Sequence, residues 1–382
     1  MPISFDLTPE QEEWRKRVRE FAQKELLPRA EEIDEKEDVP QELLDKMLKE
    51  LRLPAVWIPK KYGGFELDKV SICLITEEIG YACGSCIPFV EVAGLGTLPI
   101  VIGGKESLKE ELLPKIARGD AFPALAMTEP GCGSDAGAIT LKAERDGDEY
   151  VLKGVKRQIS QVHIASFFVT SARTHPDPSL RARGVSLFVV PKDADGIRIG
   201  EREPYIGTRG HKAYVIHFDN VRVPAENMLG EENKGFRILM QTLDETRLTL
   251  AAGNVGIAKA AFDAALEYAK KRETFRKKLW EHEAIGFMLA EIATEIEAAR
   301  LLCYKAAWLS DRGEKHTKET SMAKWYGTEL AVKAAVNAMT VLGGYGVMKG
   351  RVERCFRDAK CFTFAQGTTQ IQKLIISREI AR

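Results

Sequence analysis

Apolar residues recur at helical spacing along the first third of the chain. Between residues 10 and 34, side chains such as Trp14 and Val18 fall on one approximate helical face. Thr8 stands before Pro9, and Gln11 occupies the third helical position, which is typical of a capped helix start. The same spacing returns over residues 40–51 and 70–81, so this part of the chain is predicted to be helical.

The pattern changes near residue 121, where short alternating or β-branched runs replace the helical spacing. These runs cover residues 150–155, 167–170, 185–190 and 214–218. The turn-forming cluster at residues 145–148 precedes the first run and is typical of a hairpin. The middle of the chain is therefore predicted to form a β domain.

Long helical patterns resume after residue 230. They cover residues 251–272, 281–313, 318–342 and 370–380, and several are apolar on more than one face, which favours burial between subunits. The order predicts an α+β protein of several domains: an N-terminal helical domain over residues 1–120, a middle β-barrel domain over 121–230 and a C-terminal helical bundle over 231–382.

Composition narrows the classes of partner. The 382 residues include 56 basic and 56 acidic side chains, and this balance argues against nucleic acid or an anionic membrane as a general partner while it permits a homo-oligomer. No signal peptide and no apolar run long enough for a membrane span are predicted, which favours the cytoplasm. Seven scattered cysteines indicate a reducing compartment, and the Cys83–Cys86 pair is interpreted as buried and inert, with no metal site.

A turn-rich loop opens the β region at residues 127–135. It carries two glycines and the hydroxyls of Thr128 and Ser134, so its backbone can approach a flat ring or a phosphate-bearing ligand closely. Taken alone, such a loop is more often an ordinary surface turn.

The sequence Thr-Glu-Pro-Gly-x-Gly-Ser-Asp of this loop closely resembles the signature of the acyl-CoA dehydrogenases. The segments 243–247, 272–275, 342–346 and 357–372 resemble further motifs of that family, in the same order and spacing. The resemblance covers essentially the whole chain. It implies an N-terminal helical domain, a central β-barrel, a C-terminal four-helix bundle, FAD as cofactor, a homotetramer and an electron-transfer flavoprotein as acceptor.

The resemblance also implies roles for individual residues. The expected FAD contacts are Leu125, Met127, Thr128, Gly133, Ser134, Gln158 and Ser160 at the flavin, Arg272, Thr274, Phe275, Thr340, Gly343 and Gly344 at the FAD of an adjacent subunit, and Thr368 and Gln370 at the adenosine half. The expected CoA contacts are Ser134, Asp244, Arg247 and Gly367.

Plainer interpretations of these residues stay open. Arg272 suits a solvated helix charge, Phe275 suits a core position, and Gly343-Gly344 suits a close packing point between helices. Ser134 and Asp244 suit local capping roles.

The chain departs from the family where the chemistry needs a base. The medium-chain type takes the proton alpha to the thioester with the Glu of Tyr-Glu-Gly-Thr, but here that position is Gln366, whose neutral amide has no usable basicity. Some relatives place the Glu just before the motif arginine. That position is Thr246 here, and Glu245 is turned by about 100° around a helix.

Glu91 is the candidate replacement. The resemblance places its helix at the acyl end of the substrate pocket, and its apolar flanks would desolvate the acid and raise its pKa. The alternative is a pocket-floor acid that holds a water. Gln158, Ser160 and Ala365 stand where the family has Trp, Thr and Tyr, so the cavity is expected to be reshaped. Arg276 replaces a Gly and weakens the expectation for nearby FAD contacts.

This combination resembles the branch that acts on alicyclic thioesters, most of all the cyclohex-1-ene-1-carboxyl-CoA dehydrogenases, in which an Asp at the position of Glu91 is the base. The prediction is a 1,4-elimination that yields a conjugated cyclic diene, in anaerobic breakdown of aromatic or alicyclic compounds. A backbone N–H near Gln366 and the FAD 2′-hydroxyl would polarise the thioester carbonyl. The alternatives are ordinary α,β-dehydrogenation of a short-chain, medium-chain or cyclohexane-carboxyl thioester, and a silent member that binds FAD or acyl-CoA. An engineered exchange at Gln366 is disfavoured by Ala365 and Gln158.

Overall fold

The N-terminal domain is helical, as the spacing predicts. A computed structural model describes residues 6–382. Thr8 caps the first helix in a capping box with Gln11, which confirms that prediction. The predicted helix over residues 10–34 is interrupted by a π-helical and a 3-10 turn around Pro28, which has no N–H to donate. The helices of this domain are α1 (Pro9–Phe21), α2 (Ala30–Lys36), α3 (Gln41–Asp45), α4 (Lys69–Ala82), α5 (Pro88–Gly103) and α6 (Glu106–Arg118).

The middle domain is one eight-stranded sheet, so the predicted β domain is confirmed. Its strands are β1 (Pro123–Ala126), β2 (Lys142–Asp146), β3 (Glu149–Ser160), β4 (Phe167–Arg173), β5 (Val185–Pro191), β6 (Ile197–Glu203), β7 (Ala213–Pro224) and β8 (Met228–Leu229). The order is β6-β7-β3-β2-β4-β5-β8, and β1 pairs in parallel with β4. The predicted hairpin joins β2 and β3 through Gly147, whose φ of 63° is left-handed.

The C-terminal domain is a bundle in which α9 packs against four other helices. Its elements are α7 (Gly235–Lys271), the hairpin β9 (Glu273–Thr274) and β10 (Lys277–Lys278), α8 (Glu283–Asp311), α9 (Thr317–Leu342), α10 (Arg351–Phe362) and α11 (Thr369–Ile380). Helix α7 begins at Gly235 rather than at residue 251 as predicted. Polar residues such as Asp244 and Arg247 face partners within the fold, and this breaks the amphipathic pattern over the first turns.

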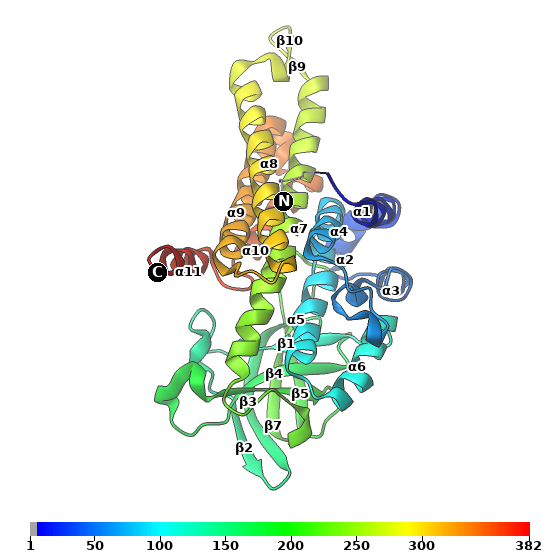
Figure 1. Cartoon of the computed structure of the whole chain (residues 1–382). Helices are drawn as coiled ribbons and strands as arrows, with labels where there is room; N and C mark the ends of the chain where they lie inside the picture. The colour runs from blue at the N-terminus through cyan, green and yellow to red at the C-terminus, as the bar shows by residue number, and fades with distance from the viewer. Residues whose placement is uncertain (1–5) are drawn as a thin grey trace.

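The three domains meet along α5 and α7. Figure 1 shows both helices running from the helical part of the molecule towards the sheet. Helix α5 packs against α7 and β1, and its residues join a buried apolar cluster that also contains residues of the sheet. Helix α5 is therefore held on several sides.

Two segments satisfy the length and composition of a membrane span, contrary to the sequence prediction. They are Gly84–Gly103 and Thr317–Val347. The first is 83% buried inside the fold. Its apolar character therefore has a sufficient cause in the packing of α5 between the domains. The second, of which 39% is buried, contains α9, which packs against α7, α8, α10 and α11.

Cys83 and Cys86 are buried and free, in agreement with the interpretation of an inert pair. A hydrogen bond with Cys83 and burial raise the pKa of the Cys86 thiol, which disfavours the reactive thiolate.

Candidate active site

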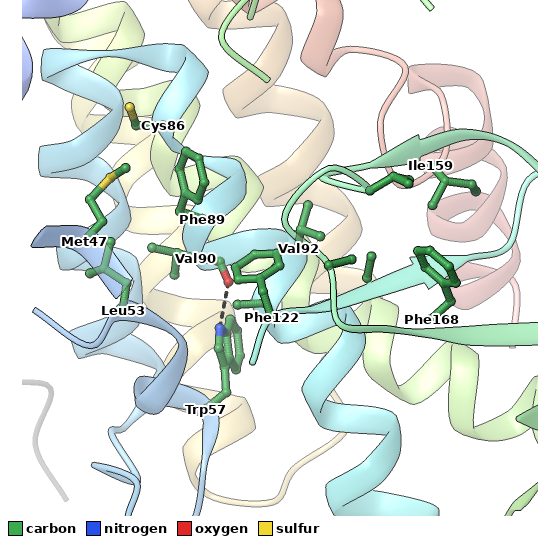
Figure 2. Close-up of a cluster of buried hydrophobic side chains, with 14 of the residues drawn as sticks. Met47, Leu53, Trp57, Cys86, Phe89, Val90, Val92, Phe122, Ile159 and Phe168 are labelled. Carbon is green, nitrogen blue, oxygen red and sulfur yellow. Dashed lines mark hydrogen bonds between the residues drawn. The ribbon is translucent and has the colours of Figure 1, made fainter. Parts of the chain in front are cut away.

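Helix α5 fixes the position of Glu91. Figure 2 shows Phe89, Val90 and Val92 of this helix among buried apolar side chains, with Trp57 hydrogen-bonded to the Val90 backbone. The Trp57 Nε1 donates to the Val90 carbonyl at 2.8 Å. A Cβ on Gly94 would lie 2.6 Å from the Trp57 ring, so the absence of a side chain there allows this close packing. The first turn of α5, where Glu91 lies, is thus rigidly placed.

Glu91 is a buried carboxyl group with an unusual pKa. Its side chain is almost fully buried, and the Gln366 Nε2 donates to its Oε1 at 2.5 Å. Burial raises the pKa of Glu91 to about 7, although the Gln366 hydrogen bond and the charge of Lys324 act in the opposite direction. A carboxyl group that titrates near neutral pH is suited to accept a proton from a substrate.

Gln366 lies in the loop between α10 and α11 and connects Glu91 to α7. Its Oε1 accepts from the Thr246 Oγ1 at 2.9 Å. Its backbone carbonyl accepts from the Arg247 Nε and the Gln372 Nε2, both at 3.1 Å. Thr246, Gln366 and Glu91 therefore form one hydrogen-bonded chain, which joins Glu91 to the two positions at which the family resemblance leads one to expect the base.

This chain can satisfy both protonation states of Glu91. The Thr246 hydroxyl also lies 3.0 Å from the Thr242 carbonyl, so its single proton has two acceptors. When Glu91 is ionised, the Gln366 amide donates to it and accepts from Thr246. When Glu91 is protonated, a 180° turn of the amide lets Gln366 accept from the acid and donate to Thr246, whose proton then points to Thr242.

Glu245 is excluded as the base. Its carboxylate accepts from the Ser310 hydroxyl at 2.7 Å and lies 3.2 Å from the His316 Nε2. These partners come from α8 and from the residue before α9, on a different side of α7 from the Gln366 loop, as the predicted rotation around the helix implies.

Asp244 and Arg247 form an ion pair at the same level of α7. The Arg247 Nη1 lies 2.9 Å from the Asp244 Oδ1, and the Thr317 hydroxyl donates to the Asp244 Oδ2 at 2.7 Å. Asp244 lies inside α7, so the interpretation as a helix cap is wrong. Ser134 is exposed in the loop that follows β1.

The glycine-bearing loop lies beside the end of β3. The Arg157 N–H donates to the Thr128 carbonyl at 2.9 Å, which brings Met127 and Thr128 next to the segment of Gln158 and Ser160. A Cβ on Gly131 or on Gly133 would meet no atom within 4 Å. Exposed backbone, open space and the partly exposed Leu125 fit a flat ring system at this face of the sheet.

A buried ion pair under this loop was missed by the sequence reasoning. The Lys156 Nζ lies 2.7 Å from the Glu129 Oε1, and both side chains are buried. The Glu129 carboxylate also accepts from the Thr140 N–H at 2.7 Å, the Thr140 hydroxyl at 2.6 Å and the Leu141 N–H at 3.0 Å. The signal was a charge at an inward position of the β3 pattern, which requires a partner.

The residues expected to reach an adjacent subunit lie at the far end of the bundle. The β9–β10 hairpin carries Thr274 and follows Arg272, and Figure 1 shows it at the end of the molecule opposite the sheet. Phe275 is 92% exposed, so the interpretation as a core residue is wrong. Arg276, with a φ of 66°, completes a two-residue turn that glycine would favour.

The segment with Thr340, Gly343 and Gly344 lies at the same end, because Tyr345 contacts Tyr268 near the end of α7. Thr340 is exposed. A Cβ on Gly343 or Gly344 would meet no atom within 4 Å, so the interpretation as a packing point is wrong.

The remaining predicted residues lie at the start of α11. Thr368 is the N-cap, and its hydroxyl accepts from the Ile371 N–H at 3.3 Å. Gln370 is exposed in the first turn. Gly367 has a φ of 95°, which suits a glycine.

The site combines a glycine-bearing loop, a buried carboxyl group that titrates near pH 7 and a polar helix pair. These features are compatible with an enzyme that binds a flat cofactor and removes a proton from its substrate. The chain belongs to the acyl-CoA dehydrogenase family: the family's N-terminal, middle and C-terminal domain models match residues 8–120, 124–221 and 233–381. It is therefore an FAD-dependent oxidoreductase that acts on acyl-CoA.

Two curated relatives span nearly the whole chain. A probable acyl-CoA dehydrogenase of Bacillus subtilis is 40% identical over 382 residues, 100% of both chains. The cyclohexane-1-carbonyl-CoA dehydrogenase of Geobacter metallireducens is 39% identical over 367 residues, 96% of both chains.

Solved structures agree with the fold. The butyryl-CoA dehydrogenase of Megasphaera elsdenii matches with a TM-score of 0.95 and 34% identity over 100% of both chains. A chain solved in work on the electron transferring flavoprotein of Acidaminococcus fermentans matches with a TM-score of 0.95 and 36% identity, also over 100% of both chains. The predicted arrangement of three domains is thereby confirmed.

Proposed function

We propose that this enzyme dehydrogenates an alicyclic acyl-CoA with Glu91 as the base, and that its substrate is cyclohex-1-ene-1-carboxyl-CoA. The observation that carries the proposal is the Glu91–Gln366 contact. An amide occupies the usual position of the base, and its Nε2 reaches a buried carboxyl group 2.5 Å further on.

The reaction needs one proton and one hydride to leave the substrate. Bound FAD supplies the hydride acceptor. Glu91 takes the proton, and its pKa of about 7 lets it do so near neutral pH. The apolar surroundings of α5 exclude water from the acid, and the hydrogen-bonded chain to Thr246 has a satisfied arrangement after Glu91 is protonated.

The depth of Glu91 favours a ring and a 1,4-elimination. A base that lies one side chain beyond the usual position faces a carbon further from the thioester. In a ring that is unsaturated next to the thioester, conjugation acidifies such an allylic carbon. Gln366 cannot take the proton at the alpha carbon, so the ordinary 1,2-elimination lacks its usual base.

A second candidate substrate is cyclohexane-1-carbonyl-CoA, with loss of hydrogen from adjacent carbons. The support is the Geobacter relative, which is 39% identical over 96% of this chain and carries that substrate in its name. Both candidates share Glu91 as base and differ in the carbon that loses the proton.

The test is anaerobic reduction of the bound flavin by four thioesters: cyclohex-1-ene-1-carboxyl-CoA, cyclohexane-1-carbonyl-CoA, butyryl-CoA and octanoyl-CoA. The proposal expects the cyclohexene ester to bleach the flavin fastest and to yield a conjugated diene. Faster bleaching by a straight-chain ester overturns the alicyclic assignment. Bleaching by none of the four supports the silent alternative.

We assign the other residues by the same proposal. Ser134, Asp244, Arg247 and Gly367 contact the CoA part, and the loop after β1 with Gln158 and Ser160 holds the flavin. Thr368 and Gln370 hold the adenosine half. These positions suit a ligand that enters between the sheet and the bundle.

We further propose a homotetramer, because the far end of the bundle is exposed and apolar. Phe275, Tyr345, Val347 and Met348 are between 60% and 92% exposed there. In the tetramer, Arg272 and Gly343 would complete the FAD site of an adjacent subunit. Sedimentation equilibrium that shows a monomer with full FAD content contradicts this arrangement.

We propose an electron-transfer flavoprotein as acceptor and the cytoplasm as location. The structural match to a chain solved in work on such a flavoprotein supports the first. Steady-state turnover with purified electron-transfer flavoprotein tests it, and turnover with molecular oxygen alone would count against it.

A further inference from the structure

Lys324 is a buried lysine of α9 whose side chain ends at the Gln366 loop. Its exposed fraction is 0%. The Nζ donates to the Thr363 carbonyl at 3.0 Å and to the Gly367 carbonyl at 2.9 Å. These two carbonyls stand on either side of Gln366, so one ammonium group ties both ends of the loop to α9.

The rest of the loop is held from other directions. Arg247 on α7 and Gln372 on α11 donate to the Gln366 carbonyl, and Gln372 also donates to the Gly367 carbonyl at 3.1 Å. Side chains from three helices thus converge on two successive carbonyls. The side chain of Gln366 leaves this anchored backbone towards Glu91, so its position depends on the anchors.

Lys324 also lies in an electrostatic environment shared with Glu91. The charged groups that act on Lys324 are Arg247 from α7, Glu329 from its own helix and Glu91 from α5. Burial and then Arg247 lower the pKa of Lys324 to about 7, while the two carboxylates act in the opposite direction. For Glu91, Lys324 is the one charged group that favours the ionised form, among the residues that the structure describes.

We propose that Lys324 is a positioning residue that holds the Gln366 loop and favours the ionised, proton-accepting form of Glu91. The inference rests on the proposed role of Glu91 and adds a residue that is not among the proposed contacts to substrate or cofactor. A lysine that served stability alone would affect the melting temperature and leave the titration of Glu91 unchanged.

Three substitutions separate charge from anchoring. Lys324→Met removes both, Lys324→Gln keeps amide donors without charge, and Lys324→Arg keeps the charge. We expect Lys324→Met and Lys324→Gln to raise the pKa of Glu91 by about one unit, because removal of a nearby opposite charge favours the neutral acid. Lys324→Arg keeps a charge at every pH of the titration, whereas Lys324 has a pKa of about 7, so this variant is expected to leave the pKa of Glu91 unchanged or to lower it. If Lys324→Met fails to fold, the comparison of Lys324→Gln with Lys324→Arg still tests the effect of the charge.

The measurement is the carboxyl stretching band of the FAD-bound enzyme by infrared difference spectroscopy, titrated from acid to alkaline pH. Glu91→Gln identifies the band by its loss. Lys333→Met is the matched control, because Lys333 also lies on α9 but is exposed and pairs with Glu295 at 2.7 Å. It is expected to leave the band and its midpoint unchanged.

The outcome does not depend on which thioester is oxidised, because the readout is the carboxyl group itself. An unshifted Glu91 midpoint in Lys324→Met and Lys324→Gln overturns the inference even where the alicyclic substrate is confirmed. A raised midpoint together with unimpaired turnover of Glu91→Gln keeps the electrostatic inference and refutes the proposed base.

Discussion

Two glutamates of this enzyme are similarly buried, but their pKa values are shifted in opposite directions. Glu91 on α5 has one amide donor, and burial raises its pKa to about 7. Glu129, below the loop after β1, has four donors, including Lys156. Burial acts to raise the pKa of Glu129 as well, but the charge of Lys156 and the hydrogen bonds outweigh it and lower that pKa.

The number and charge of the hydrogen-bond donors around each buried acid therefore decide its role. Four donors stabilise the ionised form of Glu129, which holds the loop to β3. A single neutral donor leaves Glu91 able to gain and lose a proton. The first acid holds the loop that is the proposed cofactor site, and the second is suited to proton transfer.

The largest expected effect is on the chemistry at Glu91. Glu91→Gln keeps the shape and can still accept from Gln366, but its amide cannot take a proton. We expect the rate of flavin reduction by the best thioester to fall by about 10²–10⁴-fold. Stopped-flow spectroscopy under anaerobic conditions measures it. A wild-type rate in Glu91→Gln contradicts the proposed base.

The next largest effect is expected on the free energy of unfolding, when Glu129 loses its ion partner. Lys156→Met leaves Glu129 as a buried charge without its ion partner, which costs about 3–5 kcal/mol. Unfolding by denaturant, followed by tryptophan fluorescence, measures the loss, and FAD content reports the state of the loop. Lys153→Met on the same strand is an exposed control. If Lys156→Met were as stable as this control, the ion pair would not be the element that holds the loop.

The same contrast predicts opposite pH dependence of stability. Folding raises the pKa of Glu91 from 4.5 to about 7, so its contribution is fully present below pH 4.5 and is lost as the pH rises through 7. A shift of about 2.5 units corresponds to about 3 kcal/mol. Folding lowers the pKa of Glu129, so its contribution is present above pH 4.5 and is lost at lower pH.

Glu91→Gln is therefore expected to be more stable than the wild type at pH 8, by up to about 3 kcal/mol, and little different at pH 5. Thermal unfolding of both proteins at the two pH values measures this. An equal difference at both values would show that folding does not raise the pKa of Glu91.

The sequence allowed the role of Glu91 to be predicted, but it did not reveal the Glu129–Lys156 ion pair, and the difference has a physical reason. The helical spacing and caps predicted most elements, because each depends on local residues such as Thr8 and Gln11. Glu91 could be proposed because an amide at Gln366 left the reaction without a base. The Glu129–Lys156 pair depends on the contact between a loop and a strand 27 residues apart. Neither local spacing nor the family motif required that contact.

The long α7 shows a second limit of sequence reasoning. Its first turns place Asp244, Glu245 and Arg247 towards polar partners on α8, α9 and the Gln366 loop. A pattern that counts only apolar residues begins the helix after these residues, at residue 251. The turns that carry the site were thus the part of the helix that periodicity missed.

A smaller effect is expected from substitution of Gln366, the hydrogen-bond donor to Glu91. Gln366→Met keeps the length of the side chain and removes its amide, so the ionised acid loses a hydrogen bond. We expect the pKa of Glu91 to rise by about one unit, and the pH at which flavin reduction is half-maximal to rise with it. Stopped-flow measurements between pH 6 and pH 9.5 test this. An unchanged midpoint would mean that Gln366 does not donate to the ionised acid.

Gln366→Glu should instead restore a base at the usual position and allow 1,2-dehydrogenation of butyryl-CoA.

The smallest effect is expected at Thr246, which acts on Glu91 only through Gln366. Thr246→Val removes the hydroxyl and keeps the shape, so the Gln366 amide loses its second partner in both of its orientations. Each orientation loses one neutral hydrogen bond of about 1 kcal/mol, and the two losses nearly cancel in the pKa of Glu91. We therefore expect that pKa to change by less than about 0.5 units. The amide is less well held, so flavin reduction should slow by about threefold to tenfold at every pH. Thr246→Ser keeps the hydroxyl and is expected to behave as the wild type. A large pKa shift in Thr246→Val would show that the amide is fixed in one orientation, and that the chain from Thr246 to Glu91 does not reverse when the acid gains its proton.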